Sequence, residues 1–270
     1  MNPPQIQRYL ALLETPPQPP SLPALAALVR AQLTHVPFEN LSKVHRWQRT
    51  GLTGIPDLGT YLDGIDHHHF GGTCYANNYH FYSLLAALGH DVRLCGADMS
   101  RPDVHVVILA RVDGREYLVD SGYGAPFLEP LPRDLDHDHV VPMGRDRYVL
   151  HPQDAAGRSR MELVRDGEPR HGYLVKPEAR DIREFDAVVL DSFRPDATFL
   201  NALMMVRCHP GRTVAIRNLE LLESTEGTGT ARTLRDHEEL VRAIEEHFGI
   251  DGGIAREVLK RLGKLRDVFE

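Results

Sequence analysis

A cysteine that follows two glycines at the start of a predicted helix is the residue of this chain best placed for chemistry. The run 70–89 brings Cys74 to the first turn of that helix. Free backbone N–H groups and the dipole at a helix start favour negative charge, so a thiol there is biased towards the nucleophilic thiolate. The alternative is an inert core cysteine, because free cysteine is among the most buried residue types. We expect that inert role for Cys95 and Cys208, which lie in strand-like runs.

A predicted hairpin over 104–120 supplies a second group of reactive side chains. Asp113-Gly114 is typical of a two-residue type I′ loop. With that loop, the alternation of side chains places His105 and Asp120 on one face, as diagonal neighbours about 7–8 Å apart at the backbone. A carboxylate in that position orients an imidazole and stabilises its protonated form. A core histidine that is satisfied by a chance carboxylate is the alternative.

Cysteine, histidine and aspartate together supply the thiol, the general base and the orienting acid of nucleophilic acyl transfer. Such triads are recognised by geometry and not by their order along the chain. The spacing alone therefore leaves a protease, a transglutaminase and an acyltransferase open.

The composition is that of an ordinary globular protein. The 270 residues are 42% hydrophobic and 26% charged, which argues against disorder and membrane spans. Three cysteines form no disulfide framework, and the sequence has no recognised metal-ligand spacing, so we expect no metal site and a reducing compartment. A net charge of −7 with scattered basic residues argues against nucleic-acid binding. No leader is recognised before Tyr9, which favours a cytoplasmic location without membrane contact.

Hydrophobic periodicity predicts helices first, then short strands, and finally a hairpin and two helices. We expect 37–41 to be a rigid turn with a packed Phe38 and a solvated Glu39, and 51–66 to be loop with a short helix near 56–62. The histidines at 67–69 are expected in a solvated loop. The remaining predicted helices are 6–13, 22–34, 74–88, 234–248 and 254–262, and the predicted strands are 92–97, 104–112, 116–119, 140–150 and 161–165, with a hairpin over 199–222.

Four ordered motifs resemble those of the arylamine N-acetyltransferase family, and a looser likeness extends over 185–202. The motifs are PFENL at 37–41, Gly71-Gly72-x-Cys74 with Asn78 four residues later, Val104-His105-Val106, and Val119-Asp120-Ser121-Gly122-Tyr123-Gly124 followed by Pro126.

This resemblance implies that Cys74 is the nucleophile, His105 its base and Asp120 the partner of the base. It implies an α+β fold with a cysteine-protease-like core: an N-terminal helical bundle (1–90) carrying the cysteine, an antiparallel β-barrel (91–190) carrying the histidine and aspartate, and a C-terminal α/β lid (191–270). Cys74 would take an acetyl group from acetyl-CoA, a co-substrate rather than a bound cofactor, and pass it to an arylamine or arylhydrazine.

Further residues are candidates for binding the two substrates. The loop of Ser121, Gly122 and Gly124 allows a pantetheine or phosphate to approach backbone N–H groups, and Phe199 is a candidate neighbour of the donor. Phe38 and Phe127 are candidate walls of an aromatic acceptor pocket. A simple turn and ordinary core packing are the alternatives.

Two positions depart from the family pattern. Phe70 stands where the family usually has an arginine, which leaves Glu39 without its expected partner, and Ala76 stands where glutamate or glutamine is common. The alternatives are therefore an amide synthase of natural-product assembly, whose acyl donor is bound to a carrier protein, a cysteine hydrolase, and a catalytically silent binding protein.

Overall fold

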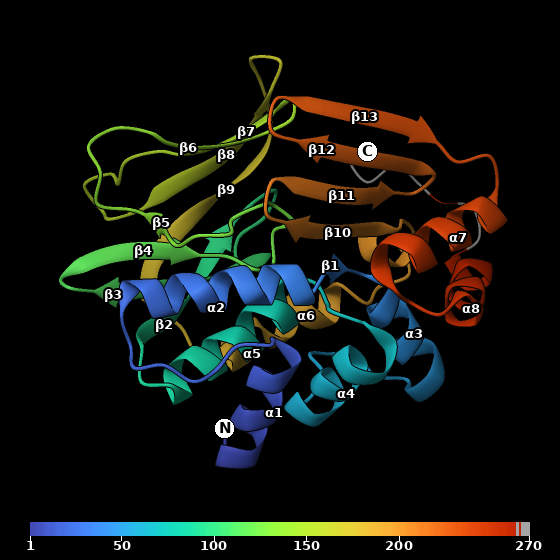
Figure 1. Ribbon diagram of the computed structural model, residues 1–270, viewed down its shortest axis with the longest axis horizontal. Helices are drawn as coiled ribbons and strands as arrows, with labels where there is room; N and C mark the ends of the chain where they lie inside the picture. Colours follow the sequence, from blue (N-terminus) through green and yellow to red (C-terminus); the bar gives the residue numbers. More distant parts are fainter. Residues whose placement is uncertain (263–264, 266–270) are drawn as a thin grey trace.

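Two antiparallel sheets surrounded by helices form the computed structural model, which describes residues 1–262 and residue 265 (Figure 1). The larger sheet has the strand order β5-β4-β3-β2-β9-β8-β7-β6 and curls into a barrel-like shape. Its strands are β2 (Asp91–Asp98), β3 (His105–Val112), β4 (Arg115–Val119), β5 (Leu131–Pro132), β6 (His139–Met143), β7 (Asp146–Leu150), β8 (Ser159–Arg165) and β9 (Glu168–Ala179). The predicted α+β class and antiparallel barrel are confirmed.

The second sheet has the order β1-β10-β11-β12-β13. Its strands are β1 (Phe38–Glu39), β10 (Met204–His209), β11 (Arg212–Arg217), β12 (Glu220–Thr225) and β13 (Thr228–Thr233). Because Phe38 pairs with Val206, the segment 37–41 is an edge strand of this sheet and not the free turn that we expected. The pairing joins the N-terminal part of the chain to its C-terminal sheet.

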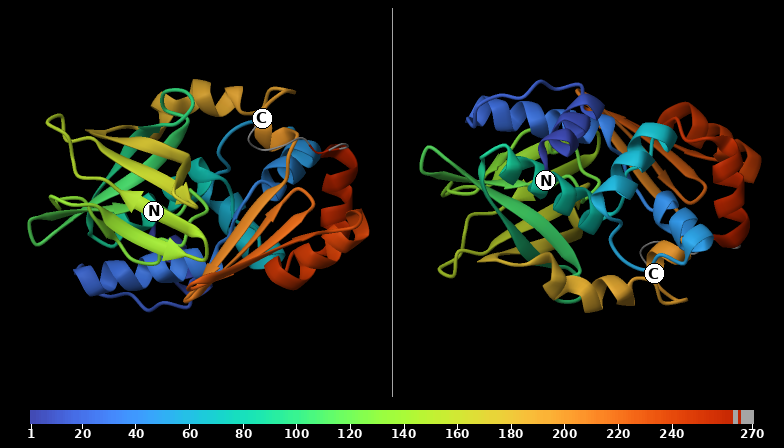
Figure 2. Two further views of the ribbon diagram at one scale, coloured as in Figure 1. Left: turned by 90° about the horizontal axis from the view of Figure 1, so that it is seen from above. Right: turned by 90° about the horizontal axis from the view of Figure 1, so that it is seen from below.

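Helices cover both sheets. Helix α5 packs against β2 and β3, while α8 packs against both α3 and α7. The two views of Figure 2 place α2 and the segment that contains α6 on opposite sides of the molecule. The helices are α1 (Pro3–Leu12), α2 (Leu22–His35), α3 (Leu41–Thr50), α4 (Leu58–His68), α5 (Cys74–Ala87), α6 (Asp186–Asp191), α7 (His237–Phe248) and α8 (Gly252–Leu262), with short 3₁₀ turns at Ile182–Phe185 and Thr198–Leu200.

Buried apolar side chains form two clusters. The first joins the N-terminal helices to the barrel-like sheet and includes Phe81 of α5 and Val107 of β3. The second lies between the C-terminal sheet and helices α3, α7 and α8, and includes Phe70. Phe70 therefore packs in a core beside the segment that leads to Cys74, where the family pattern would place an arginine.

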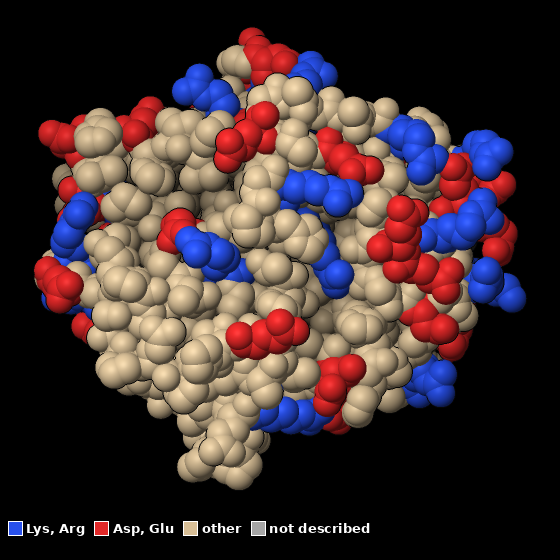
Figure 3. Space-filling model, viewed as in Figure 1, with Lys and Arg blue, Asp and Glu red and all other residues tan. Residues whose placement is uncertain are grey.

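The surface mixes both signs of charge. On the face drawn in Figure 3, acidic and basic side chains lie interspersed. None of the described helices combines the length and the apolar character needed to cross a membrane.

The predicted register of the β3–β4 hairpin is confirmed. Val112 pairs with Arg115 and Leu109 with Leu118. Asp113 and Gly114 have φ angles of 49° and 79°, the positive values that both central residues of a type I′ turn require.

Several predicted loops are regular structure. The segment 41–50 is helix α3, and α4 extends through His67 and His68, so the prediction of a solvated histidine loop is wrong. Strand β9 was not predicted, because Pro169, Gly172 and Pro177 are residues that usually interrupt strands. A bulge against β8 accommodates the irregular segment.

Glu39 is also not solvated as expected. Its side chain is fully buried, and its carboxylate accepts hydrogen bonds from the Ser42 N–H at 2.7 Å and the Gly71 N–H at 3.0 Å. One oxygen thus satisfies the start of α3 and the other holds the glycine turn before Cys74. Burial lowers the pKa of the nearby Arg46, and the charge of Glu39 opposes that shift. A cation from α3 therefore lies beside the carboxylate instead of one from position 70.

We expect Glu39→Gln to lower the free energy of unfolding by about 1–3 kcal/mol, because an amide cannot accept from both N–H groups with both of its terminal atoms. Urea unfolding at neutral pH measures this change. Glu226→Gln is the matched control, because Glu226 lies exposed in a turn. Equal stability of the two variants would contradict the role given to Glu39.

Candidate functional site

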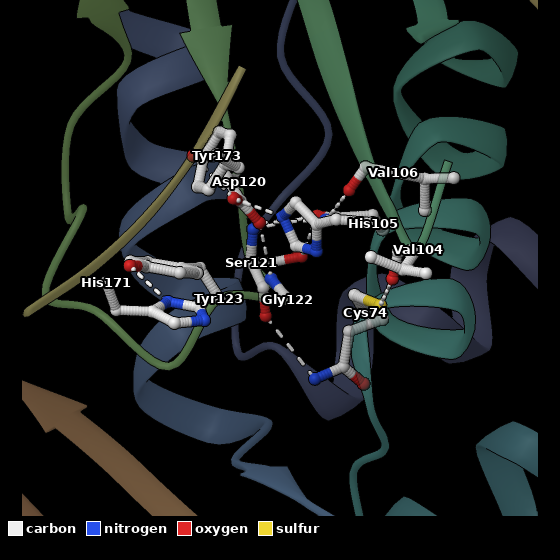
Figure 4. Close-up of polar contacts among 12 residues, drawn as sticks. Cys74, Val104, His105, Val106, Asp120, Ser121, Gly122, Tyr123, His171 and Tyr173 are labelled. Atoms are coloured by element: carbon white, nitrogen blue, oxygen red, sulfur yellow. Dashed lines mark hydrogen bonds and ion pairs between the residues drawn. The ribbon is translucent and has the colours of Figure 1, made fainter. Parts of the chain in front are cut away.

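Cys74 is the first residue of α5, and its thiol faces the end of the β3–β4 hairpin. The residue is 8% exposed, and its S–H donates to the Val104 carbonyl oxygen over 3.9 Å. In Figure 4 the His105 ring lies between the Asp120 carboxylate and the Cys74 side chain. The structure therefore brings the three predicted residues together, from one helix and from the ends of two neighbouring strands.

His105 and Asp120 form a buried pair. His105 Nε2 lies 2.8 Å from Asp120 Oδ2, and both side chains are almost inaccessible to solvent. Because the carboxylate engages Nε2, the other ring nitrogen, Nδ1, is left for Cys74. Burial alone would lower the pKa of His105, but the charge and hydrogen bond of Asp120, reinforced by Cys74, raise this pKa to about 10. An imidazolium beside a sulfur is the arrangement that favours a reactive thiolate.

The Asp120 carboxylate accepts four hydrogen bonds. Oδ2 accepts from the Tyr173 hydroxyl at 2.7 Å as well as from His105, and Oδ1 accepts from the Asn78 amide at 2.8 Å and the Gly122 N–H at 2.9 Å. Burial would raise the pKa of Asp120, but His105, Asn78 and Tyr173 together lower it. The carboxyl group is therefore held in its charged form.

Asn78 connects the cysteine helix to this carboxylate. It lies four residues after Cys74 on α5, so both side chains point to the same side of the helix. Besides binding Asp120, its amide donates to the Val106 carbonyl oxygen at 2.7 Å, and its oxygen accepts from the Ser121 N–H at 2.8 Å. One side chain thus fixes helix α5 to β3 and to the loop after β4.

Gly122 lets that loop pass directly over the start of α5. A Cβ atom at this position would lie 2.5 Å from the Cys74 Cα and 2.7 Å from the Asn78 amide nitrogen. Any larger residue would therefore push the loop and the cysteine helix apart.

A cavity of about 500 Å³ opens above Cys74 and His105. Gly122, Gly124, Phe38 and Phe199 line it, as expected for substrate-binding positions. The rings of Phe38 and Phe199 meet edge to face at 6.0 Å. These four residues are therefore within reach of a molecule in the cavity.

Two predicted binding residues lie elsewhere. Phe127 is buried and does not line the cavity; its ring stacks at 6.1 Å behind Tyr123, which does. Ser121 is also buried, and its hydroxyl donates to Asn78 at 3.0 Å. Each of them thus supports a neighbour that borders the cavity or the triad.

Several cavity or triad residues were not found from the sequence. Tyr173 lies in β9, whose prolines obscured the strand. Tyr123 lies within a quoted motif, but the choice of the more distant Phe127 overlooked it. Lys43 follows the PFENL motif, and nothing in its local sequence indicated that it borders the same cavity as Cys74.

No group of three or more histidine, cysteine or acidic side chains is placed to hold a metal within the described part of the chain. In the acidic and histidine-rich run 136–139, His137 contacts Asp136, while Asp138 contacts His151.

Comparison with known proteins identifies relatives along nearly the whole chain. A family model described as N-acetyltransferase matches residues 21–256. The chain is 26% identical over 265 residues to the chicken (Gallus gallus) arylamine N-acetyltransferase, pineal gland isozyme NAT-3, which covers 86% of this chain and 88% of the relative. It is also 26% identical over 246 residues to proansamycin X synthase of Amycolatopsis mediterranei (strain S699), over 86% of this chain and 92% of that protein.

A solved structure has the same fold. The arylamine N-acetyltransferase of Mycobacterium marinum in complex with CoA superposes with a TM-score of 0.79 at 22% identity, over 95% of this chain and 99% of that one.

We expect iodoacetamide at pH 7 to alkylate Cys74 far faster than the other two cysteines. Burial raises the pKa of Cys95 to about 11 and that of Cys208 to about 12. Their thiolate fractions at pH 7 are therefore about 10⁻⁴ or lower. Mass spectrometry of peptides from the folded protein measures the three rates. Equal labelling would refute an activated thiol at position 74.

Proposed function

The chain belongs to the arylamine N-acetyltransferase family, and on that premise we propose that it moves an acetyl group from acetyl-CoA to the nitrogen of an aromatic amine or hydrazine through an acetyl group held on Cys74. Membership of the family makes the chain an acyltransferase. The observation that carries the rest of the proposal is the buried hydrogen bond between His105 and Asp120 beside Cys74, at the base of a cavity with aromatic walls.

In the first half-reaction His105 holds the proton of Cys74, and the thiolate attacks the thioester carbonyl carbon of acetyl-CoA. The sulfur–carbonyl bond to CoA then breaks, and His105 returns the proton to the departing CoA thiolate. Backbone N–H groups at the start of α5, which have no partner within the helix, are suited to stabilise the oxyanion. The product is a thioester on Cys74.

In the second half-reaction the amine nitrogen attacks that thioester. His105 removes a proton from the nitrogen, and Cys74 leaves as thiolate beside the imidazolium. Asp120 stays charged throughout and holds the ring so that Nδ1 faces the sulfur. The cavity of about 500 Å³ has room for a single aromatic ring beside the acetyl group.

A CoA complex of the M. marinum relative supports acetyl-CoA as the donor. The likeness to proansamycin X synthase supports a second candidate, amide formation from a carrier-bound acyl thioester. That relative spans this chain as fully as the chicken enzyme does, so the two candidates differ in the donor and not in the triad.

We expect acetyl-CoA alone to add the mass of one acetyl group at Cys74, and the adduct to survive buffer exchange until an aromatic amine discharges it. Intact mass spectrometry follows the adduct, with Cys74→Ala as the unlabelled control. The adduct must persist because the walls of the cavity exclude water from the thioester. Rapid loss in buffer, with no acceleration by amine, would indicate a hydrolase. Labelling only by a carrier-bound thioester would indicate the amide synthase.

We expect Asp120→Asn to reduce kcat/KM for acetyl transfer about 10³- to 10⁴-fold while the fold persists, because an amide selects the wrong tautomer of His105. Tyr173→Phe is the matched comparison. It removes one of the four hydrogen bonds to the carboxylate and keeps the charge, so its loss should be about tenfold. Circular dichroism checks the fold. Equal losses in the two variants would contradict the role of the charge.

A further inference from the structure

Lys43 places a buried ammonium group at the wall of the cavity that contains Cys74. It lies on α3, and its Nζ donates to the Ser192 carbonyl oxygen at 2.9 Å and to the Ser192 hydroxyl at 2.6 Å. The ammonium also lies 4.1 Å from the centre of the Phe193 ring. An ammonium has three N–H donors, and Ser192 uses two of them. One donor therefore remains for a molecule in the cavity.

This ammonium has no carboxylate to neutralise it within the described part of the chain. Arg101 and Arg194 at the same cavity differ, because each forms an ion pair with Asp191, both at 2.7 Å. Burial lowers the pKa of Lys43 to about 8, and Cys74 is the group whose charge opposes this shift. At neutral pH the amine is mostly protonated, at a cost in desolvation.

The proposed reaction changes the charge around Lys43. While Cys74 is a thiolate, the cavity contains an anion that balances the ammonium. Formation of the thioester consumes that anion and leaves a buried cation facing the space that the second substrate must enter. A buried charge that loses its partner is strongly destabilising, so an incoming anion would be bound favourably.

We propose that Lys43 is a specificity-determining residue that binds a carboxylate carried by a substrate of this enzyme. The inference rests on the proposed acetyl transfer at Cys74. The carboxylate could belong to the aromatic amine or to the acyl group of the thioester, and in either case it would take the free N–H of the ammonium. The loss of negative charge on acylation favours the amine, because that substrate arrives after the thiolate has gone.

The test compares 3- and 4-aminobenzoate with their methyl esters as acceptors for acetyl-CoA, in wild type and in Lys43→Met. The acid-to-ester ratio of kcat/KM should fall about 10- to 100-fold in the variant, because one charge-assisted hydrogen bond to the carboxylate is lost. Dividing by the ester removes any general effect on Cys74 or on stability. Lys43→Arg should keep most of the preference. Arg194→Met is the matched control: it removes a cavity cation that already has a carboxylate, and it should leave the ratio unchanged.

A second measurement uses the wild-type protein alone. Benzoate should compete with a neutral arylamine at least about tenfold more strongly than benzamide does, since benzamide is similar in shape but carries no charge. A parallel pair of donors, succinyl-CoA and butyryl-CoA with aniline, locates the carboxylate. A ratio that responds to Lys43→Met only with these donors assigns it to the acyl group.

Transfer to the methyl esters separates this inference from the proposed function. If acetyl-CoA yields no transfer to the esters or to aniline, the proposed function fails. If transfer occurs, but Lys43→Met changes acid and ester equally in both arms and benzoate inhibits no better than benzamide, then Lys43 does not read a carboxylate.

Discussion

The carboxylate of Asp120 is the group on which the arrangement of this site depends. A fully buried anion is tolerated only when hydrogen bonds and an opposite charge replace water. Asp120 receives both, from Asn78, Gly122, Tyr173 and His105. Those donors come from α5, from the loop after β4, from β9 and from β3. Satisfying one carboxylate therefore fixes the relative positions of a helix and three parts of the barrel-like sheet.

The same bonds link folding to ionisation. The folded-state pKa of His105 is raised from 6.5 to about 10, so its contribution to stability is fully present below pH 6.5 and is lost as pH rises through about 10. The folded-state pKa of Asp120 is lowered from 3.8, so its contribution is present above that pH and is lost as the pH falls through the lowered value. The buried pair thus favours the native state across the neutral range, in the charge state that acyl transfer requires.

Charge at the cavity is distributed in two ways. The triad has its imidazolium and carboxylate in direct contact, and the cations Arg101 and Arg194 share Asp191. Lys43 has only neutral oxygens and an aromatic ring around it in the described structure. Since Cys74 is the nearest group able to offset its charge, the electrostatic environment of the lysine depends on whether the sulfur is free or acylated.

Local patterns in the sequence determined where the reactive residues stand on their own elements. Gly71 and Gly72 before an apolar run placed Cys74 at the start of a helix, and Asp113-Gly114 placed His105 and Asp120 on one face, because helix starts and two-residue turns depend on neighbouring residues. Tertiary structure alone decided what surrounds them. Tyr173 reaches Asp120 from 53 residues away. Glu39 is buried because Gly71 folds back onto it, and Lys43 borders the cavity because α3 packs beside the segment that carries Ser192. Such contacts depend on the docking of distant elements, and no local periodicity records them.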